Sequence, residues 1–327
     1  MVPDPSPRRY AALALVGPNP IEPHRVADLV DALVHYEPGI SAFVLVDDAP
    51  VGRDWSHVQA LLPATCKFIV EVSPRQGRGA PLLGGGGMNL LVALRRIAQL
   101  AASGVDVGPF VMKLDTDALV IARFHERLAR LLETNPDAGI IGACTISPLG
   151  KPRGVEFFSD LFARAGCLWL GRTDRAGLGR RRAWPTKMRH LRMYAHVHRA
   201  LRAGYLLGEN VSGGAYAVPT KVLLRVLEAG FLDRPETWRE TSVTEDSLFP
   251  MYARAVGGKL VDSALSPDGL FGIVWRGLCA MPDDLVARNY AFIHCLKNDP
   301  RISENDIRAY FKRRRDAVHT NGEEKAA

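Results

Sequence analysis

The strongest constraint on this fold is the alternation of short apolar runs with helical patterns along the first half of the chain. Runs without polar alternation indicate strands that are buried on both faces. We expect such strands at residues 10–16, 42–46, 68–72, 110–114 and 139–144. Helical periodicity separates them at residues 22–36, 89–102 and 122–133. Strands separated by helices of this length predict an α/β fold with a mostly parallel central sheet.

The second half is less regular. The patterns predict helices at residues 186–203, 220–229, 244–256 and 303–315. A strand at 211–218 would be interrupted by Gly213 and Gly214. Four glycines at 84–87 indicate a flexible loop, and a phosphate-binding loop is the alternative because they precede a helix.

Length and composition exclude several classes of protein. A chain of 327 residues with 47% hydrophobic and 24% charged residues is long enough to bury its own core. The 5 cysteines are odd in number and lack metal-ligand spacing, so they indicate buried thiols in a reducing compartment. The N-terminus lacks an apolar core of signal-peptide length. We therefore expect a cytoplasmic protein.

The positive charge is concentrated in one segment. Residues 172–202 contain 10 Lys or Arg and 1 acidic residue, which gives +9, whereas the whole chain carries +7 and the remainder therefore −2. This pattern indicates a local basic patch and does not favour nucleic acid as a partner. The segment is either a surface for an anionic partner, such as a membrane, or a solvated basic face.

Acidic residues follow two of the expected strands. Asp47 and Asp48 end the second strand, and Asp115 and Asp117 flank Thr116 at the end of the fourth. Ligands of open α/β sheets bind beyond the carboxyl ends of the strands. Two carboxylates one residue apart can hold a divalent ion that also binds a diphosphate. The alternative is a solvated turn after each strand.

Two further residues, Asp246 and His294, have either a chemical role or an ordinary structural one. Ser242 and Glu245 have the spacing of a helix capping box, and the alternative makes Asp246 a general base. His294 lies in an apolar run, where it is either a core residue or a third metal ligand.

Together these segments resemble one known family. The ordered set comprises Phe43-Val-Leu-Val-Asp-Asp, Asn89-Leu90, Lys113-Leu-Asp-Thr-Asp-Ala-Leu-Val, Ser212-Gly-Gly-Ala-Tyr-Ala-Val, Thr244-Glu-Asp-Ser-Leu-Phe and His294. It resembles inverting glycosyltransferases of the GT-A fold, best the β-1,3-galactosyltransferase and Fringe-like group. That group is usually Golgi-anchored and disulfide-bonded, whereas this chain has an odd number of cysteines and no apolar stretch of membrane-spanning length. It therefore resembles a bacterial-type cytoplasmic relative.

The resemblance implies a metal-dependent hexosyltransferase with a nucleoside-diphosphate donor, most simply a UDP-sugar. Asp115, Asp117 and His294 would bind Mn²⁺ or Mg²⁺, and Asp246 would be the base. The substrate-binding residues would be Gly17, Asp47, Asp48, Asp115, Gly213 and Gly214. The acceptor would be a glycan, a glycolipid or a small molecule. The basic segment 172–202 would be a lid over the diphosphate or would contact an anionic acceptor or membrane.

The same resemblance divides the chain into parts. A disordered N-terminus (1–8) would precede a nucleotide-sugar-binding half (9–150). An acceptor half (151–300) would include the basic loop 172–202, and residues 301–327 would form a C-terminal helix and a disordered tail.

Three other functions remain open at this point. A nucleotidyltransferase should carry a Gly-rich basic loop after the first strand, where this chain has Gly17-Pro-Asn-Pro. A phosphatase of the haloacid-dehalogenase type should have Thr or Val where Leu119 stands. A non-catalytic binding protein on the same fold is the third alternative. Trp238 and Trp275 either stack on a sugar or fill the core.

Overall fold

The expected alternation of strands and helices is present in the computed structural model. It describes residues 8–74, 84–168, 184–239, 241–265 and 269–323. The first half contains β1 Tyr10–Val16, α1 Glu22–Tyr36, β2 Ile40–Asp47, α2 Ser56–Leu61, β3 Lys67–Val72, α3 Gly84–Ala102, β4 Phe110–Asp115, β5 Leu119–Val120, α4 His125–Thr134 and β6 Ala138–Gly142. All five expected strands and all three expected helices are therefore confirmed, within a few residues at their ends.

The second half adds more strands than the sequence patterns predicted. It contains α5 Glu156–Arg164, α6 Trp184–Arg202, β7 Ala215–Pro219, α7 Thr220–Glu228, a 3₁₀ helix Pro235–Trp238, α8 Glu245–Ala255, β8 Lys259–Asp262, β9 Phe271–Ile273, α9 Pro282–Ala287, β10 Phe292–His294 and α10 Glu304–Glu323. The four expected helices are present. β8, β9 and β10 are too short to produce a periodic pattern of their own.

One sheet joins the two halves of the chain. Its strand order is β3-β2-β1-β4-β7-β6-β8, and only β7 runs antiparallel to its neighbours. The predicted α/β fold with a mostly parallel central sheet is thus confirmed. A second sheet, β5-β10-β9, follows directly from the end of β4.

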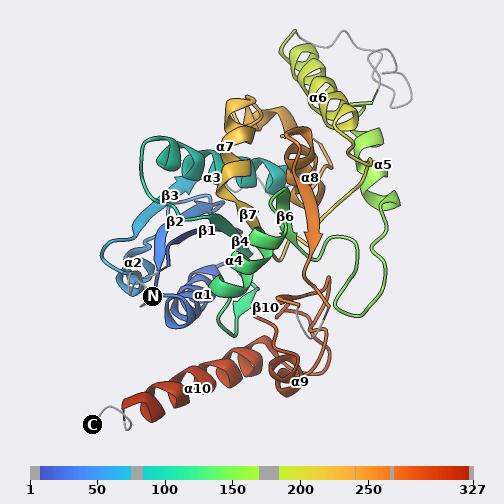
Figure 1. The fold of residues 1–327 in the computed structure, drawn as a ribbon. Coiled ribbons are helices and arrows are strands. Elements are labelled where there is room, and N and C mark those ends of the chain that lie inside the picture. Colours follow the sequence, from blue (N-terminus) through green and yellow to red (C-terminus); the bar gives the residue numbers. More distant parts are fainter. Residues whose placement is uncertain (1–7, 75–83, 169–183, 240, 266–268, 324–327) are drawn as a thin grey trace.

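Helices cover both faces of the central sheet (Figure 1). Alternate residues of β1 enter different cores: Tyr10 and Ala12 pack with α1, α2 and α4, while Ala11 and Leu13 pack with α3, α7 and α8. Burial on both faces explains the unbroken apolar runs in the sequence. α10 extends from the lower part of the molecule, and its Ile307 and Phe311 pack into the first of these cores (Figure 1).

Two local predictions need correction. Residues 84–87 belong to α3 and form no loop. The basic segment is no loop from Trp184 onwards, because that part forms α6, in agreement with the predicted helix. Residues 169–183 lie outside the described parts of the chain, as do the N-terminal residues 1–7 and the last residues 324–327.

Two features bear on the expected compartment. All five cysteines are described and carry free thiols. Among the helices that the structure describes, none combines enough length with enough apolar character to cross a membrane.

Candidate active site

The acidic turn lies where the central sheet meets the second sheet. Asp115 ends β4, and its backbone N–H donates to the carbonyl of Gly214 at 2.9 Å. The chain then enters β5, where Leu119 pairs with Ile293 of β10. This antiparallel pairing brings His294 next to the turn, although the two segments are far apart in the sequence.

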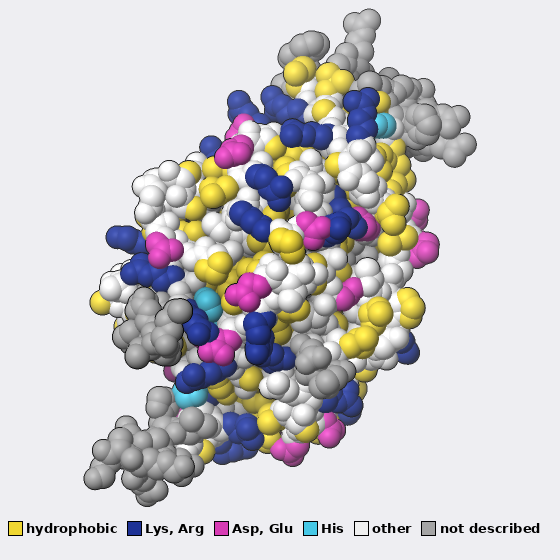
Figure 2. All heavy atoms as spheres, in the orientation of Figure 1, with side chains coloured by type: hydrophobic (Ala, Val, Ile, Leu, Met, Phe, Trp, Pro, Cys, Tyr) yellow, Lys and Arg dark blue, Asp and Glu magenta, His cyan; other side chains and the backbone are white. Residues whose placement is uncertain are grey.

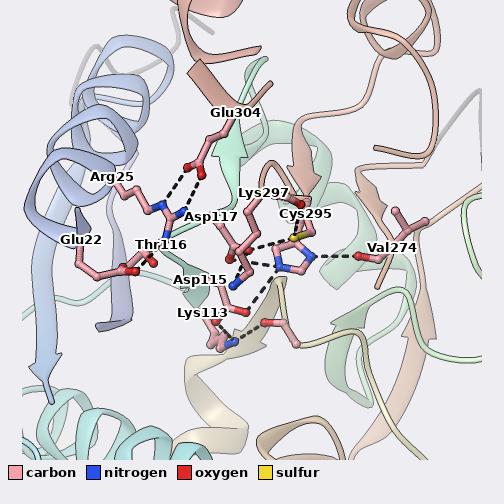
Figure 3. Close-up of polar contacts among 12 residues, drawn as sticks. Glu22, Arg25, Lys113, Asp115, Thr116, Asp117, Val274, Cys295, Lys297 and Glu304 are labelled. Atoms are coloured by element: carbon pink, nitrogen blue, oxygen red, sulfur yellow. Dashed lines mark hydrogen bonds and ion pairs between the residues drawn. The ribbon is translucent and has the colours of Figure 1, made fainter. Parts of the chain in front are cut away.

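A compact polar cluster forms there. His294 Nε2 lies 3.3 Å from Asp117 Oδ1 and 3.8 Å from Asp115 Oδ2. Asp117 Oδ2 also accepts from Cys295 Sγ at 3.1 Å and pairs with Lys297 Nζ at 2.9 Å. Figure 3 shows the labelled Asp115, Asp117, Cys295 and Lys297 converging on one point. His294 therefore lies beside both Asp115 and Asp117. Among the described residues, the possible ligand atoms that all lie within 4.8 Å of one another belong to Asp117, His294 and Cys295, and Asp115 is outside that set.

The orientation of His294 suits a cation. Its Nδ1 lies 3.0 Å from the carbonyl oxygen of Val274, which can only accept, so Nδ1 carries the hydrogen. A neutral ring then directs the Nε2 lone pair toward Asp115 and Asp117. Two carboxylates and one imidazole nitrogen are ligands that Mn²⁺ binds, and a carbonyl that fixes the ring is typical of ligating histidines. The residues present therefore fit a divalent ion.

The charges of the cluster are strongly coupled. Burial favours the neutral form of Asp117, but the hydrogen bond and charge of His294, together with Lys297, hold the pKa of this carboxyl far below its ordinary value. Burial also opposes the charged form of His294, yet Asp117 and then Asp115 raise the pKa of the imidazole. Asp117 thus stays ionised, and a proton or a metal ion competes for His294 Nε2.

Lys113 is completely buried beneath the cluster. Its Nζ lies 2.5 Å from Asp115 Oδ1 and donates to the carbonyl of Gly213. Burial lowers the pKa of Lys113, but the nearby charges, first Asp115 and then Glu245, raise it overall. Lys113 therefore stays charged and ties the acidic turn to the loop that precedes β7.

The second acidic pair begins α8. Glu245 and Asp246 occupy its first turn, where the helix dipole favours negative charge. The expected capping box is absent, because the N-cap residue is Thr244 and no side chain caps the helix. Burial, and then the neighbouring charge of Glu245, raise the pKa of Asp246 to about 7. Burial likewise raises the pKa of Glu245.

Glycines allow these groups to approach one another. A Cβ atom on Gly213 would lie 2.1 Å from Asp246 Oδ1, and one on Gly214 would lie 2.3 Å from the His294 ring. A Cβ atom on Gly86, in α3, would lie 2.6 Å from Glu245 Oε2. The sequence analysis assigned Gly213 and Gly214 to substrate approach. In the structure they first of all make room for Asp246 and His294.

One pocket of about 500 Å³ connects these groups. Asp115, His294, Gly213 and Gly214 line it together with Asp246. Asp117 lies behind His294 and is not among the described lining residues. The candidate metal site and the candidate base therefore face a common cavity.

The remaining predicted residues lie elsewhere. Asp47 Oδ1 accepts from the backbone of Ala49 and pairs with Arg53, and its Oδ2 accepts from Trp55 Nε1. Arg53 also donates to the carbonyl of Gly17. Asp47, Asp48 and Gly17 are not among the described residues that line the pocket. Their assignment to nucleotide binding stays a prediction.

Sequence reasoning missed three residues of the site. Cys295 and Lys297 lie one and three residues after His294, so their nearness in the sequence was a signal, but β10 was not predicted. Arg153 lines the pocket and bonds Asn210 Oδ1 and Ser212 Oγ. No local pattern marks Arg153, because its partners lie in another segment.

Comparisons with known proteins give distant likenesses. No family model and no curated protein sequence matches the chain. Mouse xyloside xylosyltransferase 1 in its apo form is similar at 10% identity and a TM-score of 0.42, over 82% of this chain and 88% of that chain. The bifunctional glycosyltransferase WbbM in its apo form is similar at 10% identity and a TM-score of 0.47. That match covers 95% of this chain, which spans half of WbbM (50%).

Proposed function

We propose that this protein is a metal-dependent inverting glycosyltransferase of the GT-A type. It would transfer a hexose from a nucleoside-diphosphate donor, with a UDP-sugar as the first to test, to an acceptor hydroxyl. The observation that carries the proposal is the shared pocket, which Asp115, His294 and Asp246 line together. A transferase of this kind needs a diphosphate-binding cation and a base that faces the same reacting carbon.

The donor side of the proposal rests on the cluster around the acidic turn. Asp115, Asp117 and His294 would hold Mn²⁺ or Mg²⁺. What such an ion supplies is neutralisation of the charge that develops on the leaving nucleoside diphosphate. Lys297 is about half exposed and already pairs with Asp117, so it can turn to the diphosphate once an ion takes its place.

The acceptor side rests on Asp246. Its carboxylate would take the proton of the acceptor hydroxyl as that oxygen bonds to the anomeric carbon and the bond to the diphosphate breaks. A pKa of about 7 suits this role, because the base is available near neutral pH and still holds a proton well. Attack from the face opposite the leaving group inverts the anomeric centre, and no enzyme nucleophile is needed.

Thermal denaturation tests the proposal before any acceptor is known. UDP with Mn²⁺ should raise the melting temperature, since a ligand that binds the folded state stabilises it, and chelation of the metal should abolish the shift. Slow hydrolysis of one UDP-sugar should accompany it. Asp117→Ala should fold and lose both effects. A shift with UDP that is equal in EDTA would refute the metal-dependent donor site.

A further inference from the structure

Two exposed aromatic residues line the pocket, and the proposed donor chemistry does not use them. Trp275 is 72% exposed and Phe157 is 55% exposed, and both line the pocket that contains Asp246. Exposed aromatic rings at the mouth of a pocket are typical of ligand contacts. Trp238, by contrast, is fully buried and donates from Nε1 to the Tyr252 hydroxyl, so it belongs to the core.

Phe157 has an aromatic neighbour, and the residue before Trp275 contacts His294 through its backbone. Phe157 packs edge-on against the mostly buried Phe158, with ring centroids 5.2 Å apart. Trp275 follows Val274, whose N–H donates to the His294 carbonyl and whose carbonyl fixes the His294 ring. The aromatic surface is therefore tied to the candidate metal site through one strand connection.

The charges of the pocket restrict what these rings can hold. The carboxyl groups of Asp115, Glu245 and Asp246 line it. Arg153 is the one Lys or Arg among the described lining residues, and its guanidinium is engaged with Asn210 and Ser212. The three carboxyl groups outnumber this one guanidinium, whose bonds to neutral partners leave it charged, so an anionic group beside Asp246 would meet net like charge. The lining therefore favours an uncharged occupant.

We infer that Trp275 and Phe157 form a binding surface for an uncharged pyranose ring of the acceptor. The inference rests on the proposed transferase function and names its acceptor class. One face of a pyranose presents C–H groups, which pack on the face of an aromatic ring, while its hydroxyls stay free for Asp246 and solvent. The surface would hold the acceptor ring so that one hydroxyl faces Asp246.

Saturation-transfer NMR on the full chain tests the surface directly. The probes are the methyl glycosides of glucose, galactose and N-acetylglucosamine, each measured with and without UDP and Mg²⁺. Methyl glucuronide and methyl galacturonide are the charged counterparts. At least one neutral glycoside should bind through its ring C–H protons, and its uronate should bind about tenfold more weakly.

Substitutions then assign the binding to the two rings. Trp275→Ala and Phe157→Ala should each weaken the neutral glycoside about tenfold, and Trp275→Phe should restore part of the binding. Val51→Ala, at another strongly exposed apolar residue, is the control and should change nothing.

The other outcomes overturn either the inference or the proposed function, and they differ for the two. Equal binding of the uronates would exclude the uncharged class. Unchanged glycoside binding in Trp275→Ala would exclude the surface, and loss of UDP binding in that variant would assign Trp275 to the donor. If UDP and Mg²⁺ stabilise the protein but no glycoside binds, the acceptor class is wrong and the transferase function stands. If glycosides bind but UDP does not, the transferase function fails instead.

Discussion

At the centre of this molecule, individual charged residues hold one another in place. Lys113 binds Asp115, His294 binds Asp117, and Asp246 lies against Gly213. Removing one partner would leave an uncompensated buried charge, which costs several kcal/mol in typical proteins. Substitutions at Asp246 are informative because burial and the charge of Glu245 raise the pKa of this carboxyl to about 7, so a neutral Asn can replace it.

Asp246→Asn should lower transfer by about 10²- to 10⁴-fold, because the acceptor hydroxyl loses its proton acceptor. Donor binding should persist, since the proposed metal ligands are Asp115, Asp117 and His294 and do not include Asp246. Turnover with saturating donor, alongside UDP titration by thermal shift, measures both. Glu245→Gln is the control on the adjacent carboxyl. If Glu245→Gln is inactive while Asp246→Asn turns over normally, the base is Glu245.

The pH dependence of kcat/KM should follow the same carboxyl. Activity should rise with pH up to about 7, because the base must be deprotonated and its pKa is raised to about 7 from 3.8. The residual activity of Asp246→Asn should lack this acid limb. A wild-type profile that is flat between pH 5 and 8 would contradict the assignment.

The free energy of unfolding should show the opposite dependence on pH. The folded-state pKa of Asp246 lies above the unfolded value of 3.8, so the folded protein binds the proton more tightly and stability falls as pH rises toward 7. Asn resembles the protonated acid. At pH 8, Asp246→Asn should therefore have a higher melting temperature than the wild type, with an unfolding free energy larger by roughly 1–3 kcal/mol. At pH 4 the two proteins should melt at nearly the same temperature. Calorimetry at the two pH values measures the difference.

Among the helices and strands, α10 supports the acidic turn from behind. Arg308 Nη2 donates to the Thr116 carbonyl at 3.0 Å, and Nη1 donates to Asp28 of α1 at 2.7 Å. Glu304 accepts from both Arg308 and Arg25, so a network of ion pairs joins α10 to α1 next to the turn. Figure 3 shows Arg25, Glu22 and Glu304 beside Thr116. Arg308 lies 192 residues after Thr116 in the sequence, so a distant helix supports the conformation of the acidic turn.

Arg308→Met should raise the Mn²⁺ concentration needed for half-maximal stabilisation by roughly tenfold, because outer residues that orient ligands typically contribute this much. Arg308→Lys should restore part of the affinity. The measurement is a Mn²⁺ titration followed by melting temperature. Arg313→Met, at an exposed position of α10, is the control. A lower melting temperature with an unchanged Mn²⁺ midpoint would reduce Arg308 to a purely structural role.

Across the whole molecule, the basic helix α6 and the acidic candidate active site are separate features. The pocket is acidic, whereas α6 carries Arg189, Arg192, Arg199 and Arg202 away from it. In Figure 2, dark-blue side chains gather on the upper part of the molecule, where Figure 1 places α6. The sequence leaves three roles open for this part: a lid over the diphosphate, a contact with an anionic acceptor or membrane, or a solvated basic face. Vesicle binding tests the membrane contact.

The chain should bind vesicles that contain phosphatidylglycerol at low salt and release them as salt rises, because screening weakens contacts between exposed charges. Replacing Arg180, Arg181 and Arg182 with Gln should weaken binding by about 1 kcal/mol per charge. Replacing Lys312, Arg313 and Arg314 with Gln is the matched control, because it removes three charges from exposed positions of α10. Equal binding to uncharged phosphatidylcholine vesicles would rule out an electrostatic contact.

Much of the fold could be predicted because its signals are local. A strand such as β4 is buried on both faces, so its own side chains reveal it, and a helix such as α1 shows its buried face in its periodicity. The acidic residues after β2 and β4 could be expected at the ligand-binding edge, since parallel strands end together. Local patterns did not reveal β9 and β10, which are only three residues long.

The site itself needed contacts between distant segments. Cys295 meets Asp117 across a separation of 178 residues, and Lys113 meets the Gly213 carbonyl across 100. The roles of Gly86, Arg153 and Trp275 likewise depend on which neighbours the chain places beside them. Residue type and periodicity encode burial and strand ends along the chain. Which charges neutralise one another, and which aromatic ring stays exposed in the pocket, follow only from packing in three dimensions.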